Sequence, residues 1–357
     1  MMKKVKYALV GFGGIAENRI AKEGFACDHK RFRPLHYAEL VGATDLNPAR
    51  EEAVRSLGLQ WYPTIEEVLT DDTIDAVYVA TNNKSHVPLA TECLKAGKHV
   101  IVEKPMATTV ADAKKLNKLA KAKKLSLSVD HMMVNNAWNM AGRVAMAAGK
   151  IGKVNDCCYH MEFAYGYDPA EAASWRCNKV DEMGGPIGDV ASHCFYVAEF
   201  MFNKRIAKLG AVYYPKTMKI KAEDGAYVKF FFADGSQGSV NCAFSELRGG
   251  LAGTLTNLGY EIYGDKGVMR GYGTLFQLSG YSEEPVTQRL EIDDGHRILP
   301  LRPTKIQNIY QTLIEGHAKS VLDGTPLSAE NAIHNLALCK ACHESAAKYG
   351  KLVTVKD

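Results

Sequence analysis

The sequence contains no long uninterrupted hydrophobic run. Hydrophobic residues make up 46% of its 357 positions, but they fall in short stretches, and the opening "MMKKVKYALV" leads directly into a strand-like segment. A membrane-spanning helix needs about 20 predominantly apolar residues in a row, and a secretory signal needs an apolar core before its cleavage site. We therefore expect a soluble, cytoplasmic protein without a membrane span or a signal peptide.

A strong charge of either sign is also missing. The 44 basic and 40 acidic residues give a formal charge of +4. The basic cluster "AKKLNKLAKAKKL" at 113–125 has helical spacing and is typical of a solvated helix face. We therefore expect no nucleic-acid partner.

The cysteines do not form a zinc-ligand pattern. Nine are present, but neither Cys157/Cys158 nor Cys339/Cys342 is accompanied by the second pair of ligands that a zinc site requires. We expect reduced thiols, as in cytosolic proteins, and no metal site.

Internal repeats and low-complexity linkers are absent, yet the chain is longer than most single domains. From Lys6 to about Val129, short apolar runs alternate with helical patterns, which indicates an α/β domain with a doubly wound parallel sheet. After about Lys150 the apolar residues alternate over longer stretches broken by Gly and Asp turns, which indicates a largely antiparallel sheet. We predict two domains, at 1–128 and 129–357, with a packed interface. Whether the C-terminal helix packs back on the first domain is left open.

Short apolar runs and periodic segments define the expected elements. In the first domain, strands are expected at 6–12, 38–45, 76–81, 99–105 and 125–131. Helices or helical turns are expected at 15–25, 47–58, 65–71, 85–97 and 109–124. In the second domain, strands are expected within 152–167, 206–217, 225–246 and 258–273, the clearest hairpin turning at Asp234-Gly235. Further helices are expected from about Gly188 to Phe202 and after the capping residue Ser328.

A glycine-rich turn follows the first expected strand. The segment "VGFGGIA" supplies Gly11-x-Gly13-x-x-Ala16 at the start of a helix. The first glycine permits a tight turn, the second lets the backbone approach a pyrophosphate, and the small third residue allows close packing. The helix N-terminus adds N–H groups and a partial positive charge. An ordinary glycine turn would be favoured if the motif stood alone. Residues expected to contact a dinucleotide are Gly11, Phe12, Gly13, Gly14, Ile15 and Ala16.

The next expected strand ends in an acid that points to the same cofactor. In "LVGATD" this acid is Asp45, whose carboxylate can accept hydrogen bonds from both ribose hydroxyls and repel a 2′-phosphate. The cofactor predicted is therefore NAD rather than NADP. Asp45 can also cap the helix that begins at "NPAR", and the two roles are compatible.

Polar residues follow the strand at 76–81. Thr81 and Asn82 lie at the carboxyl end of this strand, and His86 lies near the start of the next helix. The carboxyl ends of strands in an open parallel sheet line the ligand crevice, so we expect these residues near the nicotinamide half of the cofactor. For Asn82 and His86, loop and cap chemistry is an equally supported interpretation.

The apolar run "VIV" at 100–102 stops at Glu103, Lys104 and Pro105. An ammonium at this strand end can hydrogen-bond a substrate hydroxyl and stabilise the alkoxide that develops as hydride leaves. It can also lower the pKa of a neighbouring acid–base residue. We expect Glu103 to anchor near the cofactor. A surface lysine that happens to precede a proline is the less favoured interpretation of Lys104.

The chain resembles the Gfo/Idh/MocA family of nicotinamide-dependent oxidoreductases over nearly its whole length. The matching segments are "GFGGIA", "ATNNKSH", "EKP", "WRCNK", "GGPIGDVASH" and "YEIYGDKG". The resemblance implies an NAD-binding Rossmann domain followed by an α/β domain with a large, mostly antiparallel open sheet. It also implies sugar, glycoside or cyclitol substrates and a homo-oligomer, a dimer or tetramer, built through that sheet.

The resemblance further implies that Lys104 acts together with Asp189 and His193. These two residues are four apart in "GGPIGDVASH", which places both on one face of a helix. The carboxylate would orient the ring and raise its basicity, and the imidazole would take the hydroxyl proton. Trp175 and Arg176 are implied to lie near the cofactor and the active-site mouth, although an interdomain core position is equally open for Trp175.

The sequence departs from the family after the strand at 125–131. Many relatives are Arg-rich there, whereas this chain reads "VDHMMVNNAWN", with Asn135 and Asn136. His131 is either a substrate contact in the cleft or a buried, hydrogen-bonded histidine. Tyr165 belongs to an aromatic segment at 157–169, which forms either one buried sheet face or an apolar platform that binds substrate.

These features predict an NAD-dependent dehydrogenase. It would oxidise a secondary alcohol of a sugar or glycoside, with C3 of a glucoside as one option, or reduce the corresponding ketone. The alternatives are oxidation of inositol or another cyclitol, redox-neutral processing of a glycoside by tightly held NAD, and a non-catalytic dinucleotide-binding regulator. The presence of Lys104, Asp189 and His193 argues against the last of these.

Overall fold

The computed structural model describes residues 3–246, 258–275 and 288–357. The chain forms two compact units, Met1–Met132 with Gln307–Ile333 and Met133–Ile306 with His334–Asp357. Residues 307–333, assigned from the sequence to the second domain, thus belong to the first unit. Within the described ranges, no helix has the length and apolar character needed to cross a membrane.

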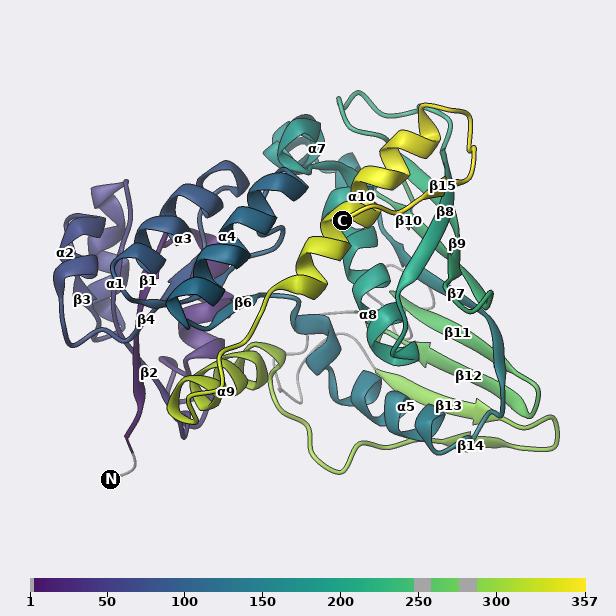
Figure 1. Cartoon of the computed structure of the whole chain (residues 1–357), viewed down its shortest axis with the longest axis horizontal. Coiled ribbons are helices and arrows are strands. Elements are labelled where there is room, and N and C mark those ends of the chain that lie inside the picture. The colour runs from purple at the N-terminus through teal and green to yellow at the C-terminus, as the bar shows by residue number, and fades with distance from the viewer. Residues whose placement is uncertain (1–2, 247–257, 276–287) are drawn as a thin grey trace. The chain divides into compact units, whose positions relative to one another are not determined.

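A six-stranded parallel sheet forms the centre of the first unit (Figure 1). Its strands are β1 (Val5–Val10), β2 (Ala38–Thr44), β3 (Gln60–Trp61), β4 (Ala76–Val79), β5 (His99–Val102) and β6 (Leu127–Val129). They lie in the order β3-β2-β1-β4-β5-β6 and pair in parallel. This is the order of a doubly wound dinucleotide-binding fold. The predicted parallel sheet is confirmed, and the two-residue β3 is an addition to it.

Helical segments connect these strands. They are η1 (Ala16–Gly24), η2 (Pro48–Arg50), α1 (Glu51–Ser56), α2 (Ile65–Thr70), η3 (Asn83–Ser85), α3 (His86–Lys95) and α4 (Val110–Lys123). A later helix, α9 (Ile309–Leu322), packs on η1 so closely that a Cβ on Gly24 would lie 2.9 Å from Ile314 Cδ1. Asn308, which caps α9, also donates to Glu23 at 3.1 Å. These contacts explain why 307–333 folds with the first unit.

A nine-stranded sheet, counted over the described residues, forms the second unit. Its strands are β7 (Val154–Glu162), β8 (Ile206–Tyr213), β9 (Gly225–Phe232), β10 (Gln237–Ala243), β11 (Leu258–Gly264), β12 (Gly267–Tyr272), β13 (Arg289–Asp293), β14 (Ile298–Pro300) and β15 (Val353–Thr354). The order is β14-β13-β12-β11-β7-β10-β9-β8-β15, in which β7 and β10 pair in parallel and the other pairs are antiparallel. The mostly antiparallel sheet is therefore confirmed, as is the hairpin at Asp234-Gly235, where Gly235 has a φ of +87°.

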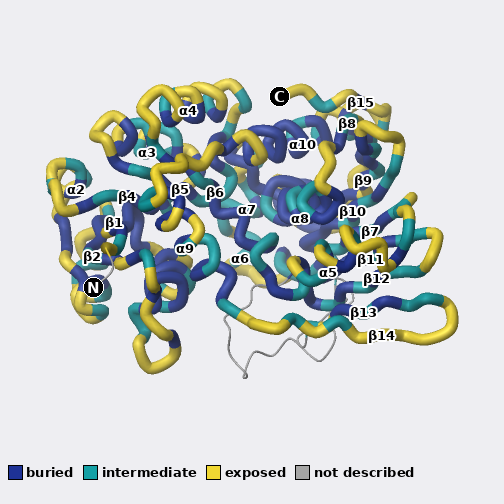
Figure 2. Tube along the Cα trace, turned by 60° about the horizontal axis from the view of Figure 1, so that its bottom comes forward, coloured by how far each residue is buried: buried dark blue, intermediate teal, exposed yellow. Residues whose placement is uncertain are grey.

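Helices pack against one face of this second sheet. The helical segments here are η4 (Met132–Asn135), α5 (Ala137–Ala147), η5 (Tyr165–Tyr167), α6 (Pro169–Ala173), α7 (Trp175–Asn178), η6 (Val180–Glu182), η7 (Ile187–Ala191), α8 (Ser192–Phe202) and α10 (Glu330–Ala346). A Cβ on Gly142 of α5 would lie 2.9 Å from Met201 of α8 and 3.1 Å from Tyr260 of β11, so the three elements are in close contact. Figure 2 shows α8 dark blue, because most of its side chains are buried. The helix expected at about 188–202 is present as η7 followed by α8.

Candidate active site

The glycine turn between β1 and η1 has the shape that a pyrophosphate requires. Gly11 has a φ of +89°, and a Cβ there would lie 2.7 Å from the carbonyl oxygen of Ala80. Only glycine fits such a position. Gly13 and Gly14 instead have open space where a Cβ would stand. A tight turn followed by accessible backbone is the combination that lets a dinucleotide phosphate approach the chain, so the turn fits this cofactor.

The helix that follows the turn begins as the sequence predicts. Ile15 precedes η1 with an exposed side chain, and Ala16, the small third residue of the motif, is buried. Asn18 Nδ2 donates to the Gly14 carbonyl at 3.0 Å, which ties the first helical turn to the glycine turn.

Asp45 follows β2 and holds the glycine turn in place. Its Oδ2 accepts the Phe12 N–H at 2.6 Å, and its Oδ1 accepts the Asn47 N–H at 2.8 Å. Arg50 adds a bond from Nε to the Phe12 carbonyl at 2.7 Å and pairs with Glu17. The capping role predicted for Asp45 is wrong, because the cap of η2 is Asn47, whose Oδ1 accepts the Ala49 N–H at 3.1 Å. Its bond to a ribose remains a prediction.

His86 ties the carboxyl end of β4 to the turn after β5. The ring is fully buried, with Nδ1 2.8 Å from the Pro105 carbonyl oxygen and Nε2 3.2 Å from that of Thr81. Burial lowers the pKa of His86, which favours a neutral ring whose single N–H donates at the shorter distance. Asn82 caps η3, its Oδ1 accepting the Ser85 N–H at 3.2 Å. The structure thus shows loop and cap contacts at Asn82 and His86, and cofactor contacts there remain a prediction.

Lys104 follows β5 beside a pair of carboxyl groups. Strands β5 and β6 pair in parallel up to their last residues, so the residues that come next, Glu103 and Asp130, are neighbours. These two side chains share a hydrogen bond, and Tyr78 Oη donates to Asp130 Oδ2 at 2.6 Å. The Lys104 N–H donates to Glu103 Oε2 at 3.1 Å. The sequence marked Glu103 and Lys104 but missed Asp130 and Tyr78, although Asp130 ends a strand just as Glu103 does.

Burial sets the protonation of this carboxyl pair. It raises the pKa of Glu103 well above its ordinary range, and the Asp130 charge adds to the rise while the Lys104 charge opposes it. It also raises the pKa of Asp130, against the hydrogen bonds from Tyr78 and Glu103. The Glu103 carboxyl group therefore stays protonated, and its O–H donates a hydrogen bond to Asp130. The pair carries a single negative charge beside Lys104.

His131 lies directly after this pair and is 4% exposed. Burial, and then the Lys104 charge, lower the pKa of His131 to about 3. The imidazole is therefore neutral at physiological pH. The structure shows the buried position, and a substrate contact of His131 remains a prediction.

Asp189 and His193 lie on one helical segment whose pitch changes between them. Asp189 belongs to the π-helix η7, and His193 is a buried residue of the α-helix α8. A π-helix bonds residue i to i+5 rather than i+4, and the shared face expected of Asp189 and His193 remains a prediction. Single π turns occur frequently at functional sites.

Four of the predicted residues form one cluster in the second unit. Arg176 Nε lies 3.4 Å from Asp189 Oδ2, and its guanidinium lies 5.0 Å from the centre of the Trp175 ring. Although burial acts against it, the charges of Asp189 and Tyr165 raise the pKa of Arg176. Tyr165, which lies in η5 rather than in a strand, bonds to both Arg176 and Glu171. Burial and this bond to Glu171 raise the pKa of Tyr165 to about 12.

A carboxyl group that the sequence did not predict caps the helix of Asp189. Glu223 Oε1 accepts the Ile187 N–H, the first of η7, at 2.9 Å. A Cβ on Gly185 would lie 2.6 Å from the same oxygen, so the glycine makes room for the carboxyl. Burial raises the pKa of Glu223 to about 7. Glu223 and Ile187 are 36 residues apart, and no local pattern signals their contact.

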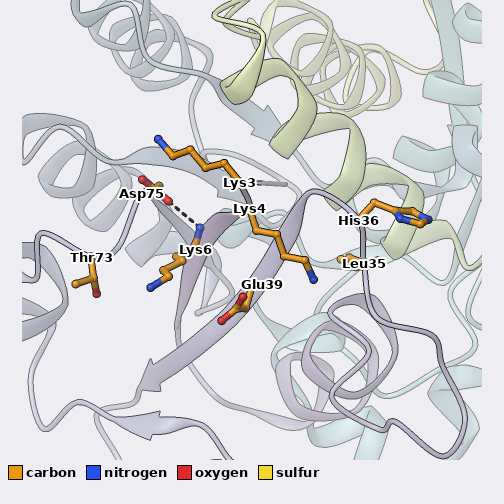
Figure 3. Close-up of a pocket in the computed structure, with 8 residues that line it drawn as sticks. All are labelled: Lys3, Lys4, Lys6, Leu35, His36, Glu39, Thr73 and Asp75. Atoms are coloured by element: carbon orange, nitrogen blue, oxygen red, sulfur yellow. Dashed lines mark hydrogen bonds between the residues drawn. The ribbon is translucent and has the colours of Figure 1, made fainter. Parts of the chain in front are cut away.

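A pocket of about 780 Å³ opens at the other end of the parallel sheet. Figure 3 shows its lining residues, which are Lys3, Lys4, Lys6, Leu35, His36, Glu39, Thr73 and Asp75. They lie at or before the amino ends of β1, β2 and β4. The glycine turn and Lys104 follow the carboxyl ends of strands, so this pocket is separate from the candidate active site.

These features together define an NAD-dependent oxidoreductase. They are the glycine turn, the acid after β2, the lysine after β5 and a second unit built on a large open sheet. The chain belongs to the Gfo/Idh/MocA family. Residues 5–131 match the family model "Oxidoreductase family, NAD-binding Rossmann fold", and residues 141–270 match the "GFO/IDH/MocA C-terminal domain". The predictions of the family, of an enzyme and of NAD as cofactor are confirmed.

Similar proteins cover most of the chain. A 1,5-anhydro-D-fructose reductase from Ensifer adhaerens is 30% identical over 294 residues, which are 80% of this chain and 81% of that protein. A scyllo-inositol 2-dehydrogenase (NADP(+)) from Bacillus subtilis is 24% identical over 300 residues, 79% of each. The structure of levoglucosan dehydrogenase in complex with NADH and levoglucosan aligns over 100% of both chains with a TM-score of 0.81 and 21% identity, which shows a shared fold.

Proposed function

We propose that this protein is an NAD-dependent dehydrogenase of a secondary alcohol on a sugar or glycoside, with C3 of a glucoside as the first position to test. The reverse reaction would reduce the corresponding ketone. The observation that carries the proposal is Lys104, a lysine at the carboxyl end of β5 beside a carboxyl pair with one negative charge. The similar proteins named for an anhydro sugar support this substrate class.

The glycine turn and Asp45 would hold the cofactor. Open space at Gly13 and Gly14 suits the pyrophosphate, and the Asp45 carboxylate suits the ribose hydroxyls. Thr81, which follows β4, would contact the nicotinamide half. When bound, NAD supplies the hydride acceptor of the reaction.

Three side chains of this chain would act on the substrate. Lys104 would donate a hydrogen bond to the reacting oxygen and stabilise the negative charge that develops there. His193 would take the hydroxyl proton, and Asp189 would orient and polarise the ring. Arg176, 3.4 Å from the Asp189 carboxylate, would hold that carboxylate in place. Tyr165 and His131 remain candidates for substrate contact.

Substitution of Lys104 by Ala tests the assignment directly. Turnover should fall by about 100-fold or more, because a preorganised donor to the reacting oxygen is lost, while NAD binding measured by calorimetry should persist. The control is Lys118→Ala, which removes an exposed lysine from α4 and should change neither quantity. Full activity of the Lys104→Ala enzyme would exclude the proposed role.

The substrate is tested with a panel of sugars, glycosides and cyclitols, scored by the accumulation of reduced cofactor. Oxidation of inositol in preference to the sugars would favour the second candidate, a cyclitol dehydrogenase, which the similarity to an inositol dehydrogenase supports. Substrate conversion without reduced cofactor would indicate redox-neutral glycoside processing by tightly held NAD. Binding of NAD without turnover of any compound would revive the non-catalytic regulator.

A further inference from the structure

Strand β7 carries three polar side chains that alternate with buried ones. Cys158, His160 and Glu162 are at positions i, i+2 and i+4 of the strand and therefore share one face of the sheet. Cys158 Sγ lies 3.1 Å from His160 Nε2, and His160 Nδ1 lies 3.1 Å from Glu162 Oε2. A thiol, an imidazole and a carboxyl in this order form the arrangement that activates a nucleophile.

The carboxyl end of this triad is held firmly. The Glu162 side chain is 4% exposed, and its second oxygen, Oε1, accepts a bond from Tyr214 Oη at 3.0 Å. The hydrogen bonds to Cys158 and then to Glu162 raise the pKa of His160 to about 10, against the effect of burial. The imidazole can therefore hold a proton received from the thiol at neutral pH.

The neighbouring strands leave the thiol end accessible. The sheet register places Ser239 of β10 and Glu261 of β11 beside Cys158, and it places Asn241 of β10 and Gly259 of β11, which has no side chain, beside His160. Cys158 is accordingly only partly buried, and the His160 side chain is 26% exposed. In the single chain, both side chains are therefore partly exposed to solvent.

We propose that Cys158 is a nucleophilic modification site that reacts with small hydroperoxides, with His160 as its base and Glu162 as the positioning residue. None of the three has a role in the dehydrogenation proposed above. The proposed modification site can therefore be tested independently of that function.

The reaction balances with the groups present and one hydroperoxide. His160 Nε2 takes the Sγ proton, and the sulfur electron pair attacks one peroxide oxygen. The S–O bond forms, the O–O bond breaks, and the departing oxygen takes the proton from His160 to leave as water or an alcohol. The sulfur is oxidised by two electrons to a sulfenic acid, and the peroxide is reduced by the same two.

The other cysteines of the chain serve as internal controls. Cys27 is the second partly buried cysteine, and the remaining seven are buried. Burial raises the pKa of Cys27 to about 12, so this thiol should react slowly despite its exposure. The ratio of the rates at Cys158 and Cys27 thus separates activation from simple access.

The experiment treats the full-length protein with hydrogen peroxide and traps sulfenic acid with a cyclic dione. The labelled cysteine peptides are quantified over time by mass spectrometry. Cys158 should be labelled at least about tenfold faster than Cys27 in the wild type, as for a thiol with an adjacent base. His160→Gln should slow Cys158 at least about tenfold, and Glu162→Gln should slow it by a smaller factor. The Cys27 rate should stay constant, because loss of folding would raise it.

Three results would overturn the proposal. The first is equal labelling of Cys158 and Cys27 in the wild type, which needs no variant to fold. The second is a Cys158 rate that survives His160→Gln. The third is an unreactive Cys158, for instance because a second copy of the chain covers this face of the sheet.

Discussion

Replacing Glu223 by Gln should remove a pH-dependent loss of stability. Burial is the largest cause that raises the pKa of this carboxyl from 4.5 to about 7 in the folded protein. The unfolded chain therefore ionises first as the pH rises, and ionisation favours unfolding. The penalty is absent below about pH 4.5 and complete above about pH 7. Gln keeps an oxygen that can accept the Ile187 N–H and carries no charge at any pH.

The magnitude follows from the two pKa values. The difference between 4.5 and about 7 corresponds to about 3 kcal/mol of unfolding free energy. About 2 kcal/mol of this should develop between roughly pH 5 and pH 8. Over that interval, the unfolding free energy of the Glu223→Gln variant should rise by about 2 kcal/mol relative to that of the wild type, which corresponds to about 5 °C in Tm for a unit of this size.

Urea unfolding of both proteins at a series of pH values measures this difference. The matched control is Glu344→Gln on α10, where an exposed glutamate is replaced. That variant should follow the wild type at every pH. A gain at Glu223→Gln that is the same at all pH values, or no gain at all, would refute the argument from burial.

Three further substitutions test the first unit. Gly11→Ala should abolish NAD binding and lower the unfolding free energy by about 3 kcal/mol, because φ is +89° and the methyl group would meet backbone atoms. The control, Gly58→Ala, has a φ of +74° and open space around the added methyl group, so it should lower the unfolding free energy by only about 1 kcal/mol. Cofactor titration and urea unfolding of the two variants measure the difference. Asp45→Asn should reduce the preference for NAD over NADP in kcat/KM by about tenfold, since the repulsion of a 2′-phosphate is lost, and an unchanged ratio would contradict the role of this acid. Tyr78→Phe should cost about 2 kcal/mol, because Asp130 loses a bond of 2.6 Å in a buried site, and an unchanged unfolding midpoint would exclude that contribution.

Most of the parallel sheet could be predicted because each of its buried strands is a short apolar run between helical segments. The two-residue β3 is too short to show any period, and it was missed. The π-helix η7 was also invisible, because its bonding pattern differs from that of an α-helix by only one residue. Helix α9 was missed, and with it the return of the chain to the first unit. The packing of α9 on η1 depends on contacts between residues far apart in the sequence, such as Glu23 and Gln311, which are 288 residues apart.

The residues of the candidate site also fall into two groups, those that the sequence locates and those that it does not. Gly11 and Lys104 could be located because a turn or a strand end needs a particular residue there, and the structure places both as expected. Partners that meet through space could not be located. Glu223 caps a helix from 36 residues away, and Tyr78 reaches Asp130 from 52 residues away. Hydrogen bonds of this kind depend on the finished sheet and leave no periodic signal in the sequence.

The two candidate catalytic segments are held by the same device. The backbone N–H of Lys104 donates to Glu103, and the first N–H of η7, the helix of Asp189, donates to Glu223. Burial raises the pKa of both acids. A carboxyl group whose pKa is raised in this way lowers stability at neutral pH, and an uncharged residue at the same position would avoid that cost. Two such groups, each bonded to the backbone of a segment with a proposed role in the reaction, indicate that positioning of these segments, rather than stability, accounts for the acids.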